Sequence, residues 1–77
     1  MEQKLFTVEY KHIKRGYNWS IDANVVSNHF NIEAISFQAG DFGVMKERAK
    51  DAINAALEQC NHAHRVKDKE IEYSPKF

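Results

Sequence analysis

The residue types best suited to chemistry in this chain are a cysteine and two histidines at alternate positions, Cys60, His62 and His64. If a helix continues through this stretch, Cys60 and His64 lie one turn apart on the same face, where both could reach one metal ion. A structural zinc site, however, normally draws four ligands from two paired modules. The sequence has no second module, so we predict no metal and no cofactor.

Cys60 is also a weak candidate for a catalytic nucleophile. Reactive cysteines lie in electropositive, partly exposed surroundings, whereas we expect this sulfur to be buried by the apolar side of a helix. The sequence offers no Gly-x-Ser-x-Gly motif, no glycine-rich phosphate loop and no pair of inward carboxylates. We therefore predict that the protein is not an enzyme.

Two groups of basic residues indicate another kind of chemistry, the binding of a phosphate backbone. The groups are Lys11, Lys14 and Arg15 early in the chain and Arg65, Lys67 and Lys69 near its end. They would straddle a nucleic-acid strand if the fold brought them side by side. The formal charge is zero, however, with 11 Lys plus Arg against 11 Asp plus Glu, and this balance argues against nucleic-acid binding as the first interpretation.

The longest regular pattern in the sequence, from Asp41 to His64, is that of a helix. Asp41 is a favoured N-cap because its carboxylate accepts the free amides of the first turn. The apolar residues recur three and four positions apart and so form one stripe, which consists of Met45, Ala49, Ala52, Ile53, Ala56, Leu57 and Cys60. No other segment has this period, so we predict a single helix.

Two runs before the helix alternate apolar and polar residues, which is the period of a half-buried strand. They cover residues 4–14 and 17–26, and Arg15-Gly16 between them gives the backbone freedom that a tight turn needs. A third strand is predicted at 32–39. The side chains that we expect to point inward are Phe6, Val8, Tyr10, Tyr17, Trp19, Ile21, Val25, Ile35 and Phe37.

These elements predict a single α+β domain over residues 1–77 with two layers. A three-stranded antiparallel meander in the order β-β-β-α carries one long helix on one face, and the contact buries the apolar side of both layers. For residues 70–77 two alternatives stay open: a short C-terminal strand, suggested by Ile71 and Tyr73, or a flexible tail. A sheet with free edges also leaves a homodimer open.

The composition is typical of folded, cytoplasmic proteins. Hydrophobic residues make up 43% and aromatic residues 12% of the 77 positions, which is enough for a small core. A single cysteine excludes an internal disulfide and suits a reducing compartment. The first ten residues contain charges, and no stretch approaches the roughly 20 apolar residues of a membrane span, so we expect neither a signal peptide nor a membrane anchor.

Some short motifs are shared with known families. Gly16-Tyr17 starts a predicted strand, and Gly40-Asp41 leads into a helix with Ala49, Ala52 and Ala56. In these places the chain resembles HicB-type antitoxin domains, although the Pro-Gly turn of that family is missing. The β-β-β-α order is also similar to a double-stranded-RNA-binding domain without its first helix, and hence without the helix-borne half of its RNA surface. Neither resemblance identifies a functional residue here.

A compact, neutral chain without a catalytic motif most readily works by covering a surface of a larger macromolecule. We therefore expect a protein partner, a large host complex, and a function as a phage or mobile-element inhibitor of host defence, similar in type to anti-CRISPR proteins. The alternative is a small nucleic-acid-binding or HicB-like antitoxin regulator that uses the basic residues. We predict that the partner contacts come from Glu9, Lys11, Lys14, Arg15, Asp22, Arg65, Lys67 and Lys69.

Overall fold

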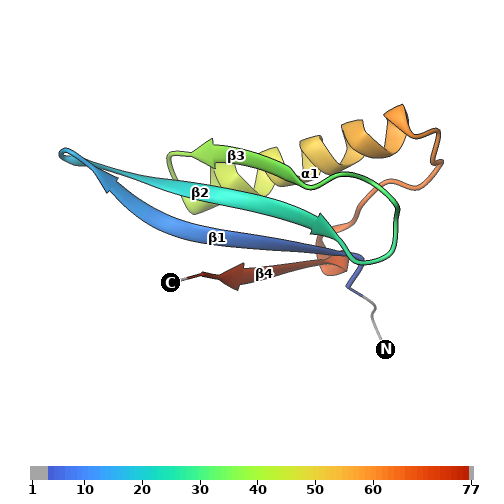
Figure 1. The fold of residues 1–77 in the computed structure, drawn as a ribbon, viewed down its shortest axis with the longest axis horizontal. Helices are drawn as coiled ribbons and strands as arrows, with labels where there is room; N and C mark the ends of the chain where they lie inside the picture. The colour runs from blue at the N-terminus through green and yellow to red at the C-terminus, as the bar shows by residue number, and fades with distance from the viewer. Residues whose placement is uncertain (1–3, 77) are drawn as a thin grey trace.

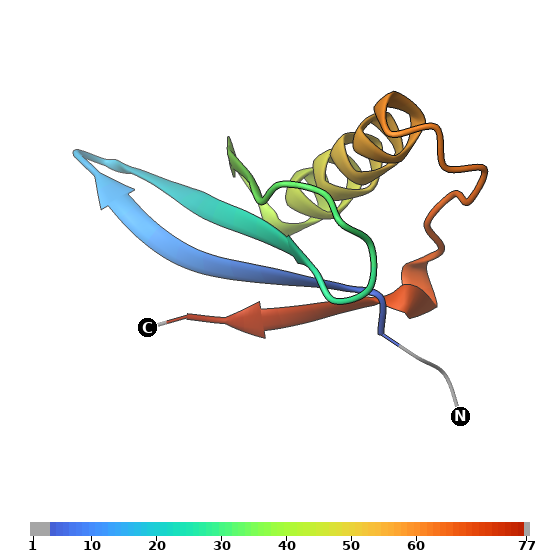
Figure 2. The ribbon, with the colours of Figure 1, turned by 45° about the vertical axis from the view of Figure 1, so that its right-hand side comes forward.

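The predicted two-layer α+β architecture is present in the computed structural model, which describes residues 4–76 (Figure 1). Three strands come first and are followed by one helix, a short 3-10 turn and a fourth strand. Their bounds are β1 Phe6–Arg15, β2 Asn18–Ser27, β3 Ile35–Ala39, α1 Phe42–Gln59, η1 Asp68–Glu70 and β4 Ile71–Pro75. Figure 2 shows that α1 covers only one of the two faces of the sheet.

The sheet has the strand order β3-β2-β1-β4. β1 pairs antiparallel with β2, and β2 pairs antiparallel with β3, as a meander requires. β4 pairs parallel with β1, with Phe6 opposite Ile71. Of the two alternatives for the C-terminal stretch, the edge strand is therefore the one observed for residues 71–75, while residue 77 lies outside the described part. The chain reaches β4 by crossing over the sheet through α1.

The β1–β2 hairpin closes through Gly16 and Tyr17. Gly16 has a φ of +64°, the left-handed value that the first central position of a II′ hairpin turn requires and that glycine adopts without a steric penalty. The hairpin then runs in one unbroken register from Arg15 opposite Asn18 to Phe6 opposite Ser27. A two-residue turn thus fixes which side chains of both strands share a face.

The helix begins and ends at residues that satisfy its free backbone groups. Asp41 is the N-cap, and its Oδ1 accepts the Val44 amide at 2.9 Å. At the other end Asn61 has a φ of +62°, its amide donates to the Glu58 carbonyl, and the His62 amide donates to the Leu57 carbonyl. This is the Schellman arrangement, with asparagine in the position that glycine most often fills. The helix therefore stops before the two histidines.

The core lies between the helix stripe and the centre of the hairpin. Its largest fully buried side chains are Phe6, Val8, Val25, Met45, Ile53 and Leu57. The prediction for the stripe is confirmed at Met45, Ala49, Ile53 and Leu57, which are all buried. It is wrong at Cys60, which is exposed, because this residue is the C-cap and the chain turns away from the sheet there. Among residues 4–76, no helix is both long and apolar enough to cross a membrane.

The inward set predicted for the strands is correct near the helix and wrong beyond it. Ile21 and Val25 are buried in β2, and Tyr10, Ile35 and Phe37 pack on the margin of the core. Tyr17 is 100% exposed and Trp19 is 59% exposed. Both alternate in step with the buried residues of β2, but they lie beyond the part of the hairpin that β3 and α1 cover.

The end of the helix stripe gives a stability prediction. Leu57→Ala removes a fully buried side chain and should lower the free energy of unfolding by about 2–5 kcal/mol, because a cavity remains. Cys60→Ala, one turn further along, should change it by no more than about 0.5 kcal/mol, because the thiol is already exposed. Urea denaturation followed by circular dichroism measures both. Equal losses for the two variants would show that Cys60 is packed after all.

Candidate binding surface on the open sheet face

The face of the sheet opposite α1 is uncovered and almost entirely polar. Side chains alternate between the two faces of a strand, so the inward parity of Val8 and Val25 assigns their neighbours to the other face. On β1, β2 and β3 the residues of this parity include Thr7, Glu9, Lys11, Ser20, Asp22, Asn24, Ser36 and Gln38, and these eight are called here the open face. Ile13 and Val26 share the same parity and are the apolar exceptions.

The cross-strand register arranges the open face in rows. Lys11 is opposite Asp22, and Asp22 is opposite Gln38 on the next strand. The neighbouring row contains Glu9 and Asn24, and the Asn24 Oδ1 accepts the Ser36 hydroxyl at 3.1 Å. Rows of this kind place unlike polar groups side by side. The surface therefore carries both signs of charge within one small area.

These rows line a shallow groove of about 570 Å³. Its open-face side chains are Glu9, Lys11, Asp22, Asn24, Ser36, Gln38 and Lys76. Lys76 comes from just beyond β4, and its Nζ lies 3.1 Å from the Glu9 Oε2. Residues from the start, the middle and the end of the chain thus meet in one surface feature.

Two polar atoms at this face are enclosed without a hydrogen-bond partner in the described part of the chain. They are the Ser20 Oγ and the Asp22 Oδ1. The other oxygen of Asp22 lies 3.7 Å from the Arg15 Nη2, which is too long for a strong hydrogen bond. An enclosed polar atom without a partner costs about 1–3 kcal/mol.

The hairpin continues past the rest of the fold as a free arm, defined here as residues 11–20 (Figure 1). β3 pairs with β2 only from Ile21 onward, and β4 pairs with β1 only as far as Tyr10. The two strands of the arm therefore have only each other as neighbours. Tyr17 and Trp19 are exposed because neither α1 nor a further strand reaches them. This is the physical reason why the predicted inward set fails there.

The predicted partner-binding residues fall into two separate places. Glu9, Lys11 and Asp22 lie together in the groove, while Lys14 and Arg15 lie on the adjoining arm. Residues 65–69 are at the opposite end of β1, where the Lys69 carbonyl accepts Lys4 Nζ and the Glu70 carbonyl accepts the Leu5 amide. Ten strand residues span roughly 33 Å. The two basic groups therefore do not form one phosphate-binding track.

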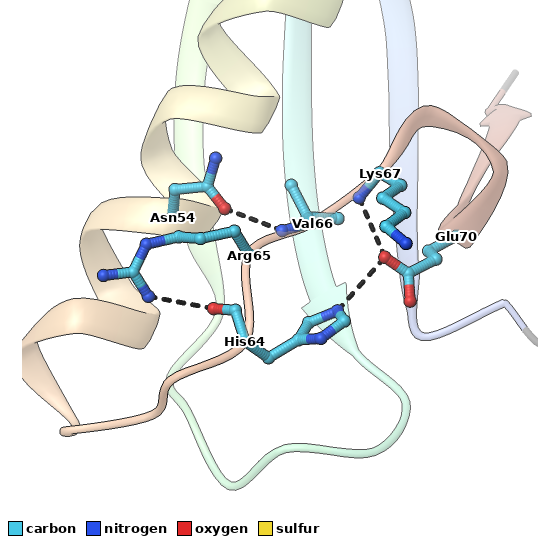
Figure 3. Close-up of polar contacts among 6 residues, drawn as sticks. All are labelled: Asn54, His64, Arg65, Val66, Lys67 and Glu70. Carbon is cyan, nitrogen blue, oxygen red and sulfur yellow. Dashed lines mark hydrogen bonds and ion pairs between the residues drawn. The ribbon is translucent and has the colours of Figure 1, made fainter.

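The segment after the helix is held by its own polar contacts (Figure 3). The Val66 amide donates to the Asn54 Oδ1 at 2.8 Å, so a helix side chain fixes the returning chain. The Glu70 Oε1 accepts the Lys67 amide at 2.8 Å and lies 3.1 Å from the His64 Nε2. The Arg65 Nη1 donates to the carbonyl of His64 at 2.9 Å. Several polar groups of this segment are thus committed to holding the loop.

The carboxyl group of Glu70 has a lowered pKa. Burial by itself would raise the pKa of Glu70, but the Lys67 amide, the hydrogen bond with His64 and the positive charges nearby outweigh it. The result is a carboxylate that is stabilised in the folded chain at neutral pH. Glu70 therefore has a structural role in fixing the loop before β4.

The Cys60-His62-His64 cluster is separated by the fold. Cys60 is exposed at the helix end, while the rings of His62 and His64 pack on Phe30, at centroid distances of 5.0 and 5.7 Å. His64 also pairs with Glu70. Among residues 4–76 no three His, Cys, Asp or Glu side chains are placed to hold a metal ion together. The two rings instead form part of an aromatic cluster at the loop.

Comparison of the chain with protein-family models, with curated proteins and with solved structures found no match. The function is therefore argued from the geometry described above.

Sequence reasoning missed part of the groove. Ser36 and Gln38 belong to it through the register of β3, and Lys76 belongs to it through the parallel pairing of β4. The alternation of residues 35–39 contains the signal for the first two. No local pattern signals Lys76, because its place depends on a strand pairing across 65 or more residues of sequence.

The Glu70 contacts predict a pH dependence of stability. The folded-state pKa is lower than the ordinary 4.5, so the carboxylate stabilises the fold fully above that value, and the effect is lost as the pH falls through the folded pKa. Glu70→Gln should cost roughly 1 kcal/mol at neutral pH. The difference from the unchanged protein should shrink as the pH falls below 4.5 and through the lower folded-state pKa.

Urea denaturation at a series of pH values measures this difference. Glu72→Gln is the matched control, since it removes an exposed carboxylate two residues away and should have little effect at any pH. A Glu70→Gln effect that did not change with pH would mean that the lost interaction is not that of the carboxylate charge.

Proposed function

We propose that this protein is a non-enzymatic binding protein that blocks a larger macromolecular complex, and that its open face is the contact surface. The observation that carries the proposal is the groove on the open face, which is lined by charged and polar side chains such as Lys11, Asp22 and Gln38. Lys11 and Gln38 are exposed, so a partner can reach their polar groups in this groove.

The chemistry of the groove supports a protein as the partner. Lys11 and Asp22 face each other across the strands, and Glu9 is paired with Lys76. A surface with alternating charges gives orientation and specificity to a protein interface, whereas a phosphate backbone attracts positive charge only. The partner surface we propose is therefore polar and carries both donors and acceptors.

The biological setting that we propose is inhibition of a host defence complex by a phage or mobile-element protein. Inhibition of this kind needs no catalytic residue, only a surface that occupies a functional site of the target. The support for this setting is the small size of the chain and the uncovered face of its sheet.

Charge and shape changes on the open face test the proposal. Lys11 and Gln38 are both exposed, so Lys11→Glu and Gln38→Arg should leave the fold intact while placing the wrong charge or bulk in the groove. We expect either change to weaken capture of the partner about tenfold or more, because like charges or unpaired groups then face each other. The measurement is affinity capture from host lysate, followed by binding and inhibition assays with the purified complex.

Glu58→Lys is the matched control, because Glu58 is exposed on the helix, away from the groove. It should bind and inhibit as the unchanged protein does. Capture of a complex that Lys11→Glu and Gln38→Arg leave unaffected would reject the open face as the contact surface.

A nucleic-acid-binding regulator is the second candidate, and the arm is the observation that favours it. Lys14 lies there over the exposed ring of Trp19, and Lys11 and Arg15 are on the other face of the same arm. A cation next to an exposed aromatic ring is typical of single-strand binding. A gel shift with single- and double-stranded DNA and RNA over a salt series tests it. Salt-sensitive binding that is lost in Lys14→Glu with Arg15→Glu would support this candidate over the first.

A further inference from the structure

We propose that the face of the sheet that carries α1 holds a binding site for single-stranded nucleic acid, in the part that lies beyond the start of the helix. The site is a strip of aromatic rings with a lysine at each end. The inference rests on the second candidate function, which it narrows to single strands and to one face of the arm. It is independent of the open face, which is on the other side of the sheet.

A continuous series of rings leads along this face from β4 to the arm. Tyr73 packs edge-on against Phe42 at a centroid distance of 5.7 Å, and Phe42 packs in the same way on Tyr10 at 5.2 Å. The Tyr10 and His12 rings follow at 6.1 Å. The cross-strand register then makes Trp19 the diagonal neighbour of His12 on the same face. These five rings are called here the aromatic strip.

The aromatic strip is accessible at several of its rings. Trp19 is 59% and Phe42 is 39% exposed, and His12 is exposed as well. β3 stops short of the arm and α1 begins only at Phe42, so no other element in residues 4–76 covers the rings on the arm (Figure 1). Tyr10 and Tyr73 are half-buried and support the exposed rings. Exposed rings of this kind suit stacking, because every base has a flat π-face.

A lysine lies over the rings at each end of the aromatic strip. The Lys14 Nζ is 5.9 Å from the centre of the Trp19 ring. At the other end the Lys46 Nζ is 5.8 Å from the centre of the Phe42 ring and 5.4 Å from that of Tyr73. Rings on which bases stack and cations that follow the phosphates are the two components of a single-strand site.

The strands contribute no carboxylate to this face. Glu9 and Asp22 have the opposite parity and line the groove of the open face. Arg15, which lies near Asp22, belongs to that face too. The cation that β1 contributes to the aromatic strip, Lys14, therefore has no acidic side chain of the strands beside it. The chain as a whole is neutral, but here the strands present positive charge only.

The carboxylates near the helix end of the aromatic strip are engaged or point elsewhere. Asp41 is the N-cap of α1 and accepts an amide of the first turn at 2.9 Å. Asp68, which precedes β4, is paired with Lys50 at 3.0 Å. Glu47 is two residues from the buried Met45, and hence on the opposite side of the helix. The field along the rings therefore complements a phosphate backbone.

The aromatic strip borders a hollow of about 240 Å³ at the edge of β1. β4 ends at Pro75, so the edge of β1 beyond Tyr10 has no strand beside it. The hollow is lined by Tyr10, Lys11, His12, Pro75 and Lys76. Two of these side chains are lysines and none is acidic, although the Lys76 Nζ also contacts Glu9. The hollow gives a phosphate of the bound strand a place next to the rings.

A single strand fits this surface better than a duplex. The bases of a duplex stack on one another and leave no face for the rings, whereas unpaired bases can be splayed out and stacked on aromatic side chains. The exposed Trp19 and Phe42 rings have a use only in the second case.

Titration with an oligothymidylate of about 12 nucleotides tests the proposal. Trp19 is the only tryptophan among the 77 residues, so the intrinsic fluorescence of the protein reports directly on the aromatic strip. We expect the oligonucleotide to quench this emission as it binds, because a base then stacks on the indole ring. The affinity should fall as salt is raised. A duplex of the same length should bind more weakly and leave the emission unchanged.

Fluorescence anisotropy of a labelled oligothymidylate measures the variants. Trp19→Leu and Phe42→Leu each remove a ring but keep an apolar side chain, and each should raise the dissociation constant about tenfold. Lys14→Gln should weaken binding and reduce the slope of log affinity against log salt by about 0.7. Arg15→Gln is the matched control: it removes the same charge at the next residue, on the other face, and should bind as the unchanged protein does.

The outcomes separate the inference from the functions proposed above. Absence of binding at low salt would overturn both the inference and the second candidate function. Binding that leaves the Trp19 emission unchanged, that Arg15→Gln weakens as much as Lys14→Gln, or that favours the duplex would overturn the aromatic strip alone. None of these results concerns the open face, which Gln38→Arg tests separately.

Discussion

The packing of one helix stripe against the centre of one hairpin is the contact on which the rest of the structure depends. Met45, Ile53 and Leu57 are fully buried on the helix side, and Phe6 and Val25 are fully buried on the sheet side. A chain of 77 residues has little further apolar surface with which to build a core. Every other feature therefore follows from what this single contact covers and what it leaves uncovered.

The two surfaces that this contact leaves uncovered, the open face and the arm, differ in polarity. One whole face of the sheet remains open, and there the alternation of the strands supplies polar residues such as Asp22 and Gln38. The arm is uncovered on both faces. On one of them its side chains continue the alternation of the buried residues, and Trp19 on this face is exposed. A polar surface suits a polar partner, while an exposed aromatic ring beside a lysine suits a surface that excludes water. The two proposed contacts follow from this difference.

The segment after the helix returns to the sheet and completes it. Its contacts also explain side chains that the sequence alone presents as candidate metal ligands. Asn61 stops the helix, Asn54 holds Val66, and Glu70 fixes the turn that leads into β4. His64 contributes to the same turn through Glu70. These contacts let Ile71 pair beside Phe6 as a parallel edge strand. A cluster that resembles a ligand set in the sequence thus serves to place a strand.

The sequence by itself determined the elements and most of the core, because periods of two and of 3.6 residues are local properties. They identify the helix stripe up to Leu57 and the inward residues of the hairpin near Val8 and Val25. The same periods could not show how far along each element burial extends. Trp19 and Cys60 have the correct spacing for burial, yet both are exposed. Only the tertiary structure decided this, because burial depends on whether another element reaches that point. The place of Lys76 in the groove and the distance between the two basic groups were likewise decided by the pairing of β4 with β1, a contact between the two ends of the chain that no local pattern encodes.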